Sequence, residues 1–144
     1  MQSRSGKLAD AAASYARAVE IQRELARLAP AQKSYRHDLA VSLNNLGLAQ
    51  SGLRHSAEAE RSFRQALELQ EALVRQNSRD LELRSSLGGI YNNLAIVLED
   101  LQRPEEAAAS YQKAVEHQKA ASSQAPKVSR SRIFLSKHYY NYGR

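Results

Sequence analysis

Residues 43–66 read LNNLGLAQSGLRHSAEAERSFRQA, and residues 91–114 read YNNLAIVLEDLQRPEEAAASYQKA. The second stretch begins 48 positions after the first. Both keep an Asn-Asn-Leu string, a small residue directly after it, and an aromatic residue three positions before the closing alanine. Self-similarity at a fixed spacing is the signature of a repeat architecture.

The same 48-residue step extends over the whole chain. An aromatic residue recurs as Tyr15, Phe63 and Tyr111. The other threefold identities are Ala11, Ala59 and Ala107; Ser14, Ser62 and Ser110; Ala18, Ala66 and Ala114; Glu20, Glu68 and Glu116; Gln22, Gln70 and Gln118; Arg36, Arg84 and Arg132; Leu39, Leu87 and Leu135; and Asn45, Asn93 and Asn141. We therefore expect a repeat array in which this step is the period.

Each repeat is predicted to fold as a pair of helices. Apolar residues lie on one face of the first helix at helical spacing: Leu39, Leu43 and Leu46 in one copy and Leu87, Tyr91, Leu94 and Leu98 in the next. The second helix is expected to bury alanines beside a large ring, which lets two helices approach closely. These buried residues are Ala59, Phe63, Ala66, Leu67, Leu73 and Val74, and likewise Ala11, Tyr15, Ala18, Val19 and Leu25.

The pattern gives an all-α chain of six helices in a single domain, residues 1–144. We call the first helix of each pair a first-type helix and the second a second-type helix. The predicted first-type helices are 31–51, 80–101 and 128–143, and the predicted second-type helices are 8–28, 55–77 and 105–124. The expected order is therefore a second-type helix 8–28, a hairpin 31–77, a hairpin 80–124 and a terminal first-type helix 128–143. Gly52 and Pro104 are expected at the turns inside the hairpins.

These motifs resemble the tetratricopeptide repeat, in which a large apolar residue precedes Leu-Gly, followed by an alanine with an aromatic residue four positions later. The matching residues are Leu43, Leu46, Gly47, Ala59, Phe63 and Ala66, and then Tyr91, Leu94, Ala95, Ala107, Tyr111 and Ala114. The usual unit is shorter, at about 34 residues, and the additional positions follow Ala66. The long second helices and Asn-Asn strings are similar to the repeats of kinesin light chains and to repeats appended to bacterial serine/threonine kinases. The resemblance implies a right-handed superhelical solenoid of antiparallel hairpins that binds protein through a concave groove.

Composition limits the functional classes. Hydrophobic residues make up 42% of the 144 residues and charged residues 25%, as in folded helical proteins. The sequence has no cysteine, which excludes disulfides and zinc knuckles, and no apolar run long enough for a membrane span. The first four residues lack the apolar stretch of a secretory signal, so a cytoplasmic protein is expected.

The net charge of +6 is concentrated at one end. Residues 1–116 carry 15 basic and 15 acidic side chains. The excess follows Glu116 and consists of Lys119, Lys127, Arg130, Arg132, Lys137 and Arg144. A basic end is suited to an acidic partner, although a solvated terminal helix would have the same composition.

No pattern of catalysis, cofactor binding or metal binding is present. The sequence lacks a phosphate-binding glycine loop, a His-Glu-x-x-His string and a nucleophile elbow. The four histidines, His37, His55, His117 and His138, do not have metal-ligand spacing on a helix face. The recurring serines lie beside the core aromatic residue at packing positions. We therefore expect no enzymatic activity, no cofactor and no metal.

A second face of the first-type helices is the predicted binding site. Its candidate peptide-binding residues are Val41, Asn44, Asn45 and Leu48 in one copy, Gly89, Asn92, Asn93 and Ile96 in the next, and Lys137, Tyr140 and Asn141 in the third. An asparagine carboxamide both donates and accepts, so it can bind one peptide unit of a partner backbone. The resemblance to kinesin light chains implies this role for Asn45, Asn93 and Asn141. The alternative is that these asparagines join adjacent helices.

Two other functions remain open. Nucleic-acid binding through the basic end would use Tyr139, Tyr140, Tyr142 and Phe134 beside the basic residues. Tyr139 and Tyr142, however, fall in register with the core positions Leu43 and Leu46. Head-to-tail self-association is suggested by the order of the predicted helices, which begins with a second-type helix and ends with a first-type helix. Each of these two helices would have one uncovered face, and the two faces would be complementary.

Overall fold

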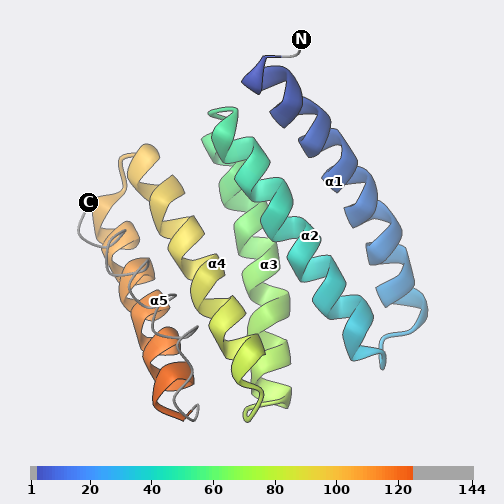
Figure 1. The fold of residues 1–144 in the computed structure, drawn as a ribbon, viewed down its shortest axis with the longest axis vertical. Helices are drawn as coiled ribbons and strands as arrows, with labels where there is room; N and C mark the ends of the chain where they lie inside the picture. The colour runs from blue at the N-terminus through green and yellow to red at the C-terminus, as the bar shows by residue number, and fades with distance from the viewer. Residues whose placement is uncertain (1–2, 125–144) are drawn as a thin grey trace. The chain divides into compact units, whose positions relative to one another are not determined.

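The computed structural model describes residues 3–124, and every secondary-structure element in that range is an α-helix (Figure 1). The helices are α1 (Arg4–Leu28), α2 (Lys33–Gly52), α3 (Ser56–Gln76), α4 (Leu81–Asp100) and α5 (Pro104–Gln124). The all-helical prediction is confirmed. The structure describes five helices, and the predicted sixth, 128–143, lies outside the described residues. None of the described helices is long and apolar enough to cross a membrane.

The helix boundaries agree with the predicted ones to within two positions, except at the start of α1. This helix begins at Arg4 because Ser3 serves as its N-cap: the Ser3 hydroxyl accepts a hydrogen bond of 3.1 Å from the backbone N–H of Gly6. The two first-type helices α2 and α4 begin at Lys33 and Leu81, which are 48 positions apart and therefore correspond to each other in the repeat. The second-type helices α3 and α5 likewise begin at the equivalent positions Ser56 and Pro104.

The turns after α2 and α4 share one backbone geometry. Arg54 has a φ of 66° and Gln102 a φ of 59°, both in the left-handed region. The following amides donate back to the helix, from His55 to the carbonyl of Gln50 at 2.8 Å and from Arg103 to that of Leu98 at 2.9 Å. This is the Schellman arrangement, in which glycine normally holds the left-handed position. Gly52, the residue expected to make the first turn, is instead the last residue of α2.

The chain divides into two compact units, one ending at Leu69 and one beginning at Gln70. In the first unit, α1 and α2 lie side by side and antiparallel (Figure 1). The first part of α3 packs on α2 through the ring of Phe63, which is 1% exposed. A Cβ atom on Gly47 of α2 would lie 2.6 Å from this ring, so only glycine permits the approach. Beside it, the Ser62 hydroxyl donates to Oε1 of Gln50 at 2.7 Å.

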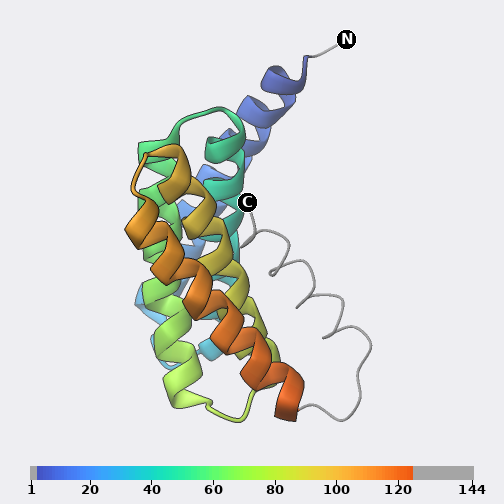
Figure 2. The same cartoon turned by 90° about the vertical axis from the view of Figure 1, so that its left-hand side faces the viewer.

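In the second unit, α4 and α5 form an antiparallel hairpin, visible in Figures 1 and 2. The Ser110 hydroxyl of α5 donates to the carbonyl of Tyr91 in α4 at 2.8 Å. Gln118 of α5 is buried and donates to the carbonyl of Ser85 at 2.6 Å. Gln70, at the end of α3 that belongs to this unit, is equally buried and donates to the carbonyl of Leu83 at 3.0 Å. Both glutamines thus satisfy backbone carbonyls of α4.

The predicted core is confirmed in α3 and only partly in α1. All six residues predicted to be buried in α3 are at most 7% exposed. In α1, Val19 is buried as predicted, whereas Tyr15 is only half-buried. The prediction for Leu25 is wrong: its side chain is 38% exposed, while Leu73 at the corresponding position of α3 is fully buried. The physical reason is that α1 packs on α2 and has no first-type helix described on its other side.

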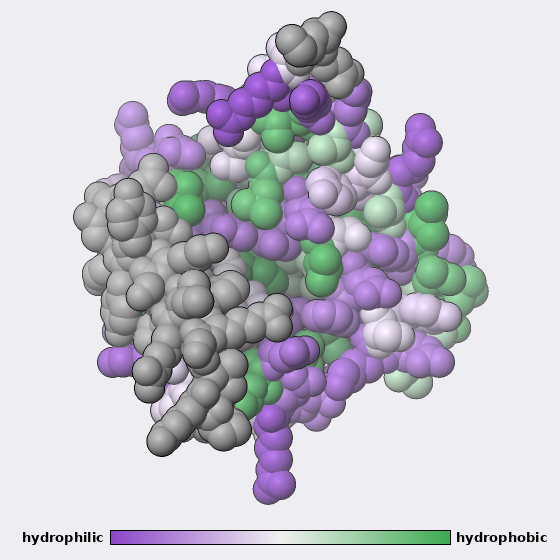
Figure 3. Space-filling view, in the orientation of Figure 1, coloured by the Kyte–Doolittle hydropathy of each residue, from purple (hydrophilic) through white to green (hydrophobic). Residues whose placement is uncertain are grey.

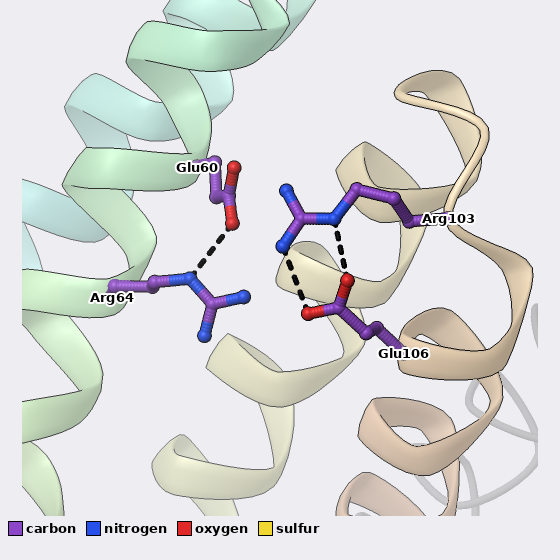
Figure 4. Close-up of polar contacts among 4 residues, drawn as sticks. All are labelled: Glu60, Arg64, Arg103 and Glu106. Carbon is purple, nitrogen blue, oxygen red and sulfur yellow. Dashed lines mark hydrogen bonds and ion pairs between the residues drawn. The ribbon is translucent and has the colours of Figure 1, made fainter.

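Exposed ion pairs bind neighbouring turns within single helices (Figure 4). On α3, Nε of Arg64 lies 2.8 Å from a carboxylate oxygen of Glu60. At the start of α5, Arg103 holds Glu106 with two contacts, of 2.6 and 2.8 Å. Pairs of this kind contribute about 0.3–0.5 kcal/mol each, so they stabilise these helices slightly and do not determine the fold.

Candidate functional site

The predicted binding face of α2 carries exposed apolar side chains. Val41 is 44% exposed and Leu48 is 46% exposed, and they lie two turns apart on one side of the helix. Asn44 and Asn45 lie between them and are half-exposed. The opposite side of α2 is buried through Leu39 and its neighbours, which explains why Val41 and Leu48 are left outside the core. An apolar pair next to carboxamides can bind both side chains and backbone of a polypeptide.

The corresponding face of α4 is less exposed. Gly89, Asn93 and Ile96 are half-exposed, whereas Asn92 is only 5% exposed. Oδ1 of Asn92 is buried and accepts no hydrogen bond from the described part of the chain. Such an unpaired acceptor costs on the order of 1–3 kcal/mol. Of the four predicted residues on α4, Asn92 therefore exposes the least surface to a partner, and its Oδ1 would gain the most from a hydrogen-bond donor.

The third set of predicted site residues, Lys137, Tyr140 and Asn141, lies outside the described residues. The structure accordingly places eight of the eleven predicted residues. It groups four on one side of α2 and four on one side of α4, each set within its own unit.

Sequence reasoning missed a polar cluster in the second unit. The ring of Tyr91 in α4 stacks on that of His117 in α5, with centroids 5.7 Å apart and planes 8° from parallel. The Tyr91 hydroxyl donates to the carboxylate of Glu71 in α3. Burial raises the pKa of Tyr91, and the hydrogen bond to Glu71 adds to this rise. The repeat pattern alone treats Tyr91 as an ordinary core residue.

The surroundings of His117 disfavour its protonated form. Burial lowers the pKa of His117, and the positive charges of Arg84 and Lys113 lower it further, against the opposing effects of Glu116 and Glu71. A departure from the repeat could have revealed this cluster. His117 and Glu71 stand where the preceding repeat has Leu69 and Arg23.

The arginines that recur at positions 36 and 84 share one environment. Nε of each is buried and donates no hydrogen bond to any of the described residues. Within residues 3–124, no group of three His, Cys, Asp or Glu side chains is arranged to hold a metal ion.

Comparison with known protein families identifies the repeats. Residues 39–80, which run from α2 to just beyond the end of α3, match one model of the tetratricopeptide repeat. Residues 88–120, within α4 and α5, match another. Together the two matches cover just over half of the chain. No curated protein and no solved structure matches the chain. Tetratricopeptide repeats generally mediate protein–protein interactions, and proteins built from them are typically non-enzymatic. On these two matches, this chain belongs to the tetratricopeptide repeat family.

Proposed function

We propose that the chain is a scaffold that binds an extended segment of a partner polypeptide on the exposed side of its first-type helices. The observation that supports this most directly is the pair Val41 and Leu48 on α2. Each is close to half exposed, and the pair flanks two asparagines. A helix in water gains nothing from two exposed aliphatic side chains on one side, whereas a binding face gains the apolar area that its partner covers.

The asparagines supply the specificity for a peptide backbone. Each carboxamide can donate to a carbonyl and accept from an N–H of the same partner residue. Oδ1 of Asn92 is a buried acceptor that receives no hydrogen bond from residues 3–124, and a partner N–H that reached it after a side-chain rotation would supply one. We further propose, from the sequence pattern and its likeness to kinesin light chain repeats, that the helices form a superhelix with a 48-residue period and a concave groove.

The partner is expected to carry acidic side chains. The chain has 21 basic and 15 acidic residues, and its six uncompensated charges follow Glu116. Complementary charge raises the association rate and makes binding sensitive to salt.

The test begins with selection from a library of random linear peptides, with the wild-type chain as bait. The affinity of a selected peptide is then measured for the wild type and for Val41→Glu, Asn45→Ala and Asn93→Ala. Each substitution should weaken binding about tenfold, the equivalent of one lost hydrogen-bonding or apolar contact. Ala57→Glu, at an exposed position of the second-type helix α3, is the control and should bind normally.

The results separate the possible roles of the asparagines. If Asn93→Ala lowers the melting temperature by several degrees and leaves peptide affinity unchanged, the asparagine joins helices and is not a ligand. If no selected peptide distinguishes Val41→Glu from Ala57→Glu, the proposed face is wrong.

A second function, self-association, is favoured by a separate observation. One side of α1 is exposed where the corresponding sides of α3 and α5 are buried.

A further inference from the structure

The two compact units differ in the kind of surface that a partner could bind. Among residues 3–124, every exposed large apolar side chain belongs to the first unit, and Figure 3 shows the part of this surface on α1 at the right-hand edge of the view. These side chains are Ile21, Leu25, Leu28, Val41 and Leu48. The described part of the second unit is therefore better suited to recognition through charged groups, which form the stronger hydrogen bonds.

Basic side chains of the second unit converge on the stacked rings of Tyr91 and His117. Lys113 is exposed and lies one turn before His117 on the same face of α5. Arg84 lies two turns before Tyr91 on the same side of α4. We call His117, Lys113 and Arg84 the basic cluster.

Arg84 belongs to this cluster although it lies on the facing helix. The carbonyl of Ser85, which follows Arg84, accepts a hydrogen bond of 2.6 Å from Gln118, which follows His117, so Arg84 and His117 lie at one level of the hairpin. Nε of Arg84 is buried and donates no hydrogen bond to any of the described residues. A buried donor gains free energy when it finds an acceptor, so an acceptor supplied by a partner would be favourable here.

The charges around His117 are unbalanced towards the positive. Burial is the largest cause of its lowered pKa, and the next are Arg84 and Lys113, whose combined effect exceeds the opposing effects of Glu116 and Glu71. The carboxylate of Glu71 is also engaged, because it accepts a hydrogen bond from the hydroxyl of Tyr91. An additional negative charge beside His117 would therefore be stabilised by its surroundings.

The first repeat provides an internal comparison for this cluster. Arg36 of α2 corresponds to Arg84, but the positions that correspond to Tyr91, Lys113 and His117 hold Leu43, Gln65 and Leu69. The position of Glu71 is taken by Arg23, which donates to Oε1 of Gln65 at 2.9 Å. Because the first repeat folds without this set of side chains, the repeat fold does not require it.

We propose that His117, Lys113 and Arg84 form a second binding site, which holds a carboxylate side chain of an acidic partner polypeptide. Lys113 supplies an ammonium group and Arg84 a guanidinium donor. The imidazole of His117 takes up a proton from solvent when the carboxylate arrives, so that it donates as well. Glu71 and Glu116 disfavour a doubly charged phosphate more than a singly charged carboxylate. This inference goes beyond the proposed function, because the site uses none of the residues of the α2 and α4 faces.

Binding at this site is linked to the protonation of His117. A carboxylate within about 4–6 Å favours the protonated imidazole and should raise the pKa of His117 by about one unit. Linkage is reciprocal, so protonation strengthens binding by the same factor, which is about tenfold. The affinity should be lowest above the pKa of the bound state and should rise as the pH falls towards the lower pKa of the free state.

The experiment is a proton NMR titration of the histidine rings in the full chain, between about pH 8 and about pH 5. The signal of His117 is assigned by its loss in His117→Gln. The probe is a tetrapeptide with blocked ends, acetyl-Gly-Glu-Glu-Gly-amide, and the comparison is the same peptide with glutamine in place of both glutamates. The glutamate peptide should raise the pKa of His117 by about one unit, and the glutamine peptide should leave it unchanged.

Matched variants separate the site from the net charge of the chain. Lys113→Gln and Lys119→Gln remove the same charge from exposed positions on different sides of α5. Lys113→Gln should weaken the glutamate peptide about threefold, as expected for one exposed ion pair, whereas Lys119→Gln should bind it like the wild type. Arg84→Gln should also weaken binding, and Arg36→Gln should not. Circular dichroism checks that each variant keeps its helices, and the lysine pair decides alone if Arg84→Gln does not fold.

Several results would overturn the proposal. One is a pKa of His117 that the glutamate peptide leaves unchanged. Another is equal weakening by Lys113→Gln and Lys119→Gln, which would mean that the peptide responds only to net charge. A shift caused by inorganic phosphate but not by the glutamate peptide would assign the site to a phosphate group instead. The α2 face is tested with Val41→Glu and a selected peptide, so either idea can fail while the other stands.

Discussion

A Cβ atom on Gly47 would lie 2.6 Å from Cε1 of Phe63, so α2 and α3 approach each other more closely there than any side chain on residue 47 would allow. Because of this close approach, Gly47→Ala should destabilise the fold, although the same change elsewhere in a helix is usually stabilising. Gly→Ala inside a helix normally gains about 1 kcal/mol. At residue 47 the methyl group must displace a buried ring, and overpacking of this kind costs about 1–3 kcal/mol. Gly47→Ala should therefore lower the free energy of unfolding measured in urea.

Gly52→Ala is the matched control for that measurement. Its Cβ atom would meet Cδ1 of Leu8 at 2.9 Å, the far end of a flexible side chain that can rotate away. We expect Gly52→Ala to be close to neutral, and a larger loss at Gly52 than at Gly47 would contradict the steric argument.

The aromatic residues of the three second-type helices should differ in their contribution to stability. Phe63→Ala should cost about 3–5 kcal/mol, as for other fully buried rings, and Tyr111→Ala nearly as much. Tyr15→Ala should cost clearly less, since its ring is only half-buried. Chemical denaturation at a concentration where the protein is monomeric measures all three, and equal losses would refute this order.

The stability of the second unit should depend on the protonation of His117. Its pKa is lowered in the fold, first by burial and then by Arg84 and Lys113. The unfolded chain, with an ordinary histidine pKa of about 6.5, therefore takes up a proton at a higher pH than the folded chain. The contribution of His117 to stability is complete above that value and falls as the pH drops through about 6.5 towards the folded-state pKa.

The check is urea unfolding at about pH 7.5 and about pH 5.5 for the wild type and His117→Gln. Because other groups also titrate in this range, the informative quantity is the difference between the two proteins. His117→Gln should lose less stability on acidification than the wild type. An identical loss in both would show that His117 does not contribute to the pH dependence.

The left-handed residues that end α2 and α4 should tolerate glycine well. Arg54 and Gln102 have φ values of 66° and 59°, and this conformation costs a non-glycine residue about 1–2 kcal/mol. Arg54→Gly and Gln102→Gly should raise stability by up to about 1 kcal/mol after the entropic cost of glycine is subtracted. Ser51→Gly, at an ordinary helical position, should lower it, and thermal unfolding distinguishes the two effects.

The sequence predicted the parts of this structure that depend on repetition. The helices and the burial of Phe63 and Tyr111 followed from residues that recur at one spacing. The exposure of Leu25 did not follow, because Leu25 and Leu73 are chemically identical and differ only in what the described residues pack against each of them. The prediction of the first turn was wrong for a different reason: Gly52 is the obvious turn residue, but Arg54 adopts the left-handed conformation.

The exposure of the candidate face on α2 was predictable, whereas the burial of individual side chains on these faces was not. Helical periodicity placed Val41 and Leu48 on an exposed side of α2. It could not foresee that Asn92 would be buried while Asn44, at the same register, is half-exposed. The Tyr91–His117 pair was also missed, since it depends on side chains from two helices that break the repeat pattern together.

The buried glutamines have a consequence for how the helices choose their partners. Each has a buried carboxamide that donates a hydrogen bond to one backbone carbonyl of α4: Gln70 donates to Leu83, and Gln118 donates to Ser85. Alanine-lined helices can otherwise slide past each other at little cost, because small side chains interlock weakly. A shift by one helical turn would leave the carboxamide buried and unpaired, at a cost of about 1–3 kcal/mol. The glutamines therefore fix the alignment of neighbouring helices, in the way that one buried polar residue selects the register of a coiled coil.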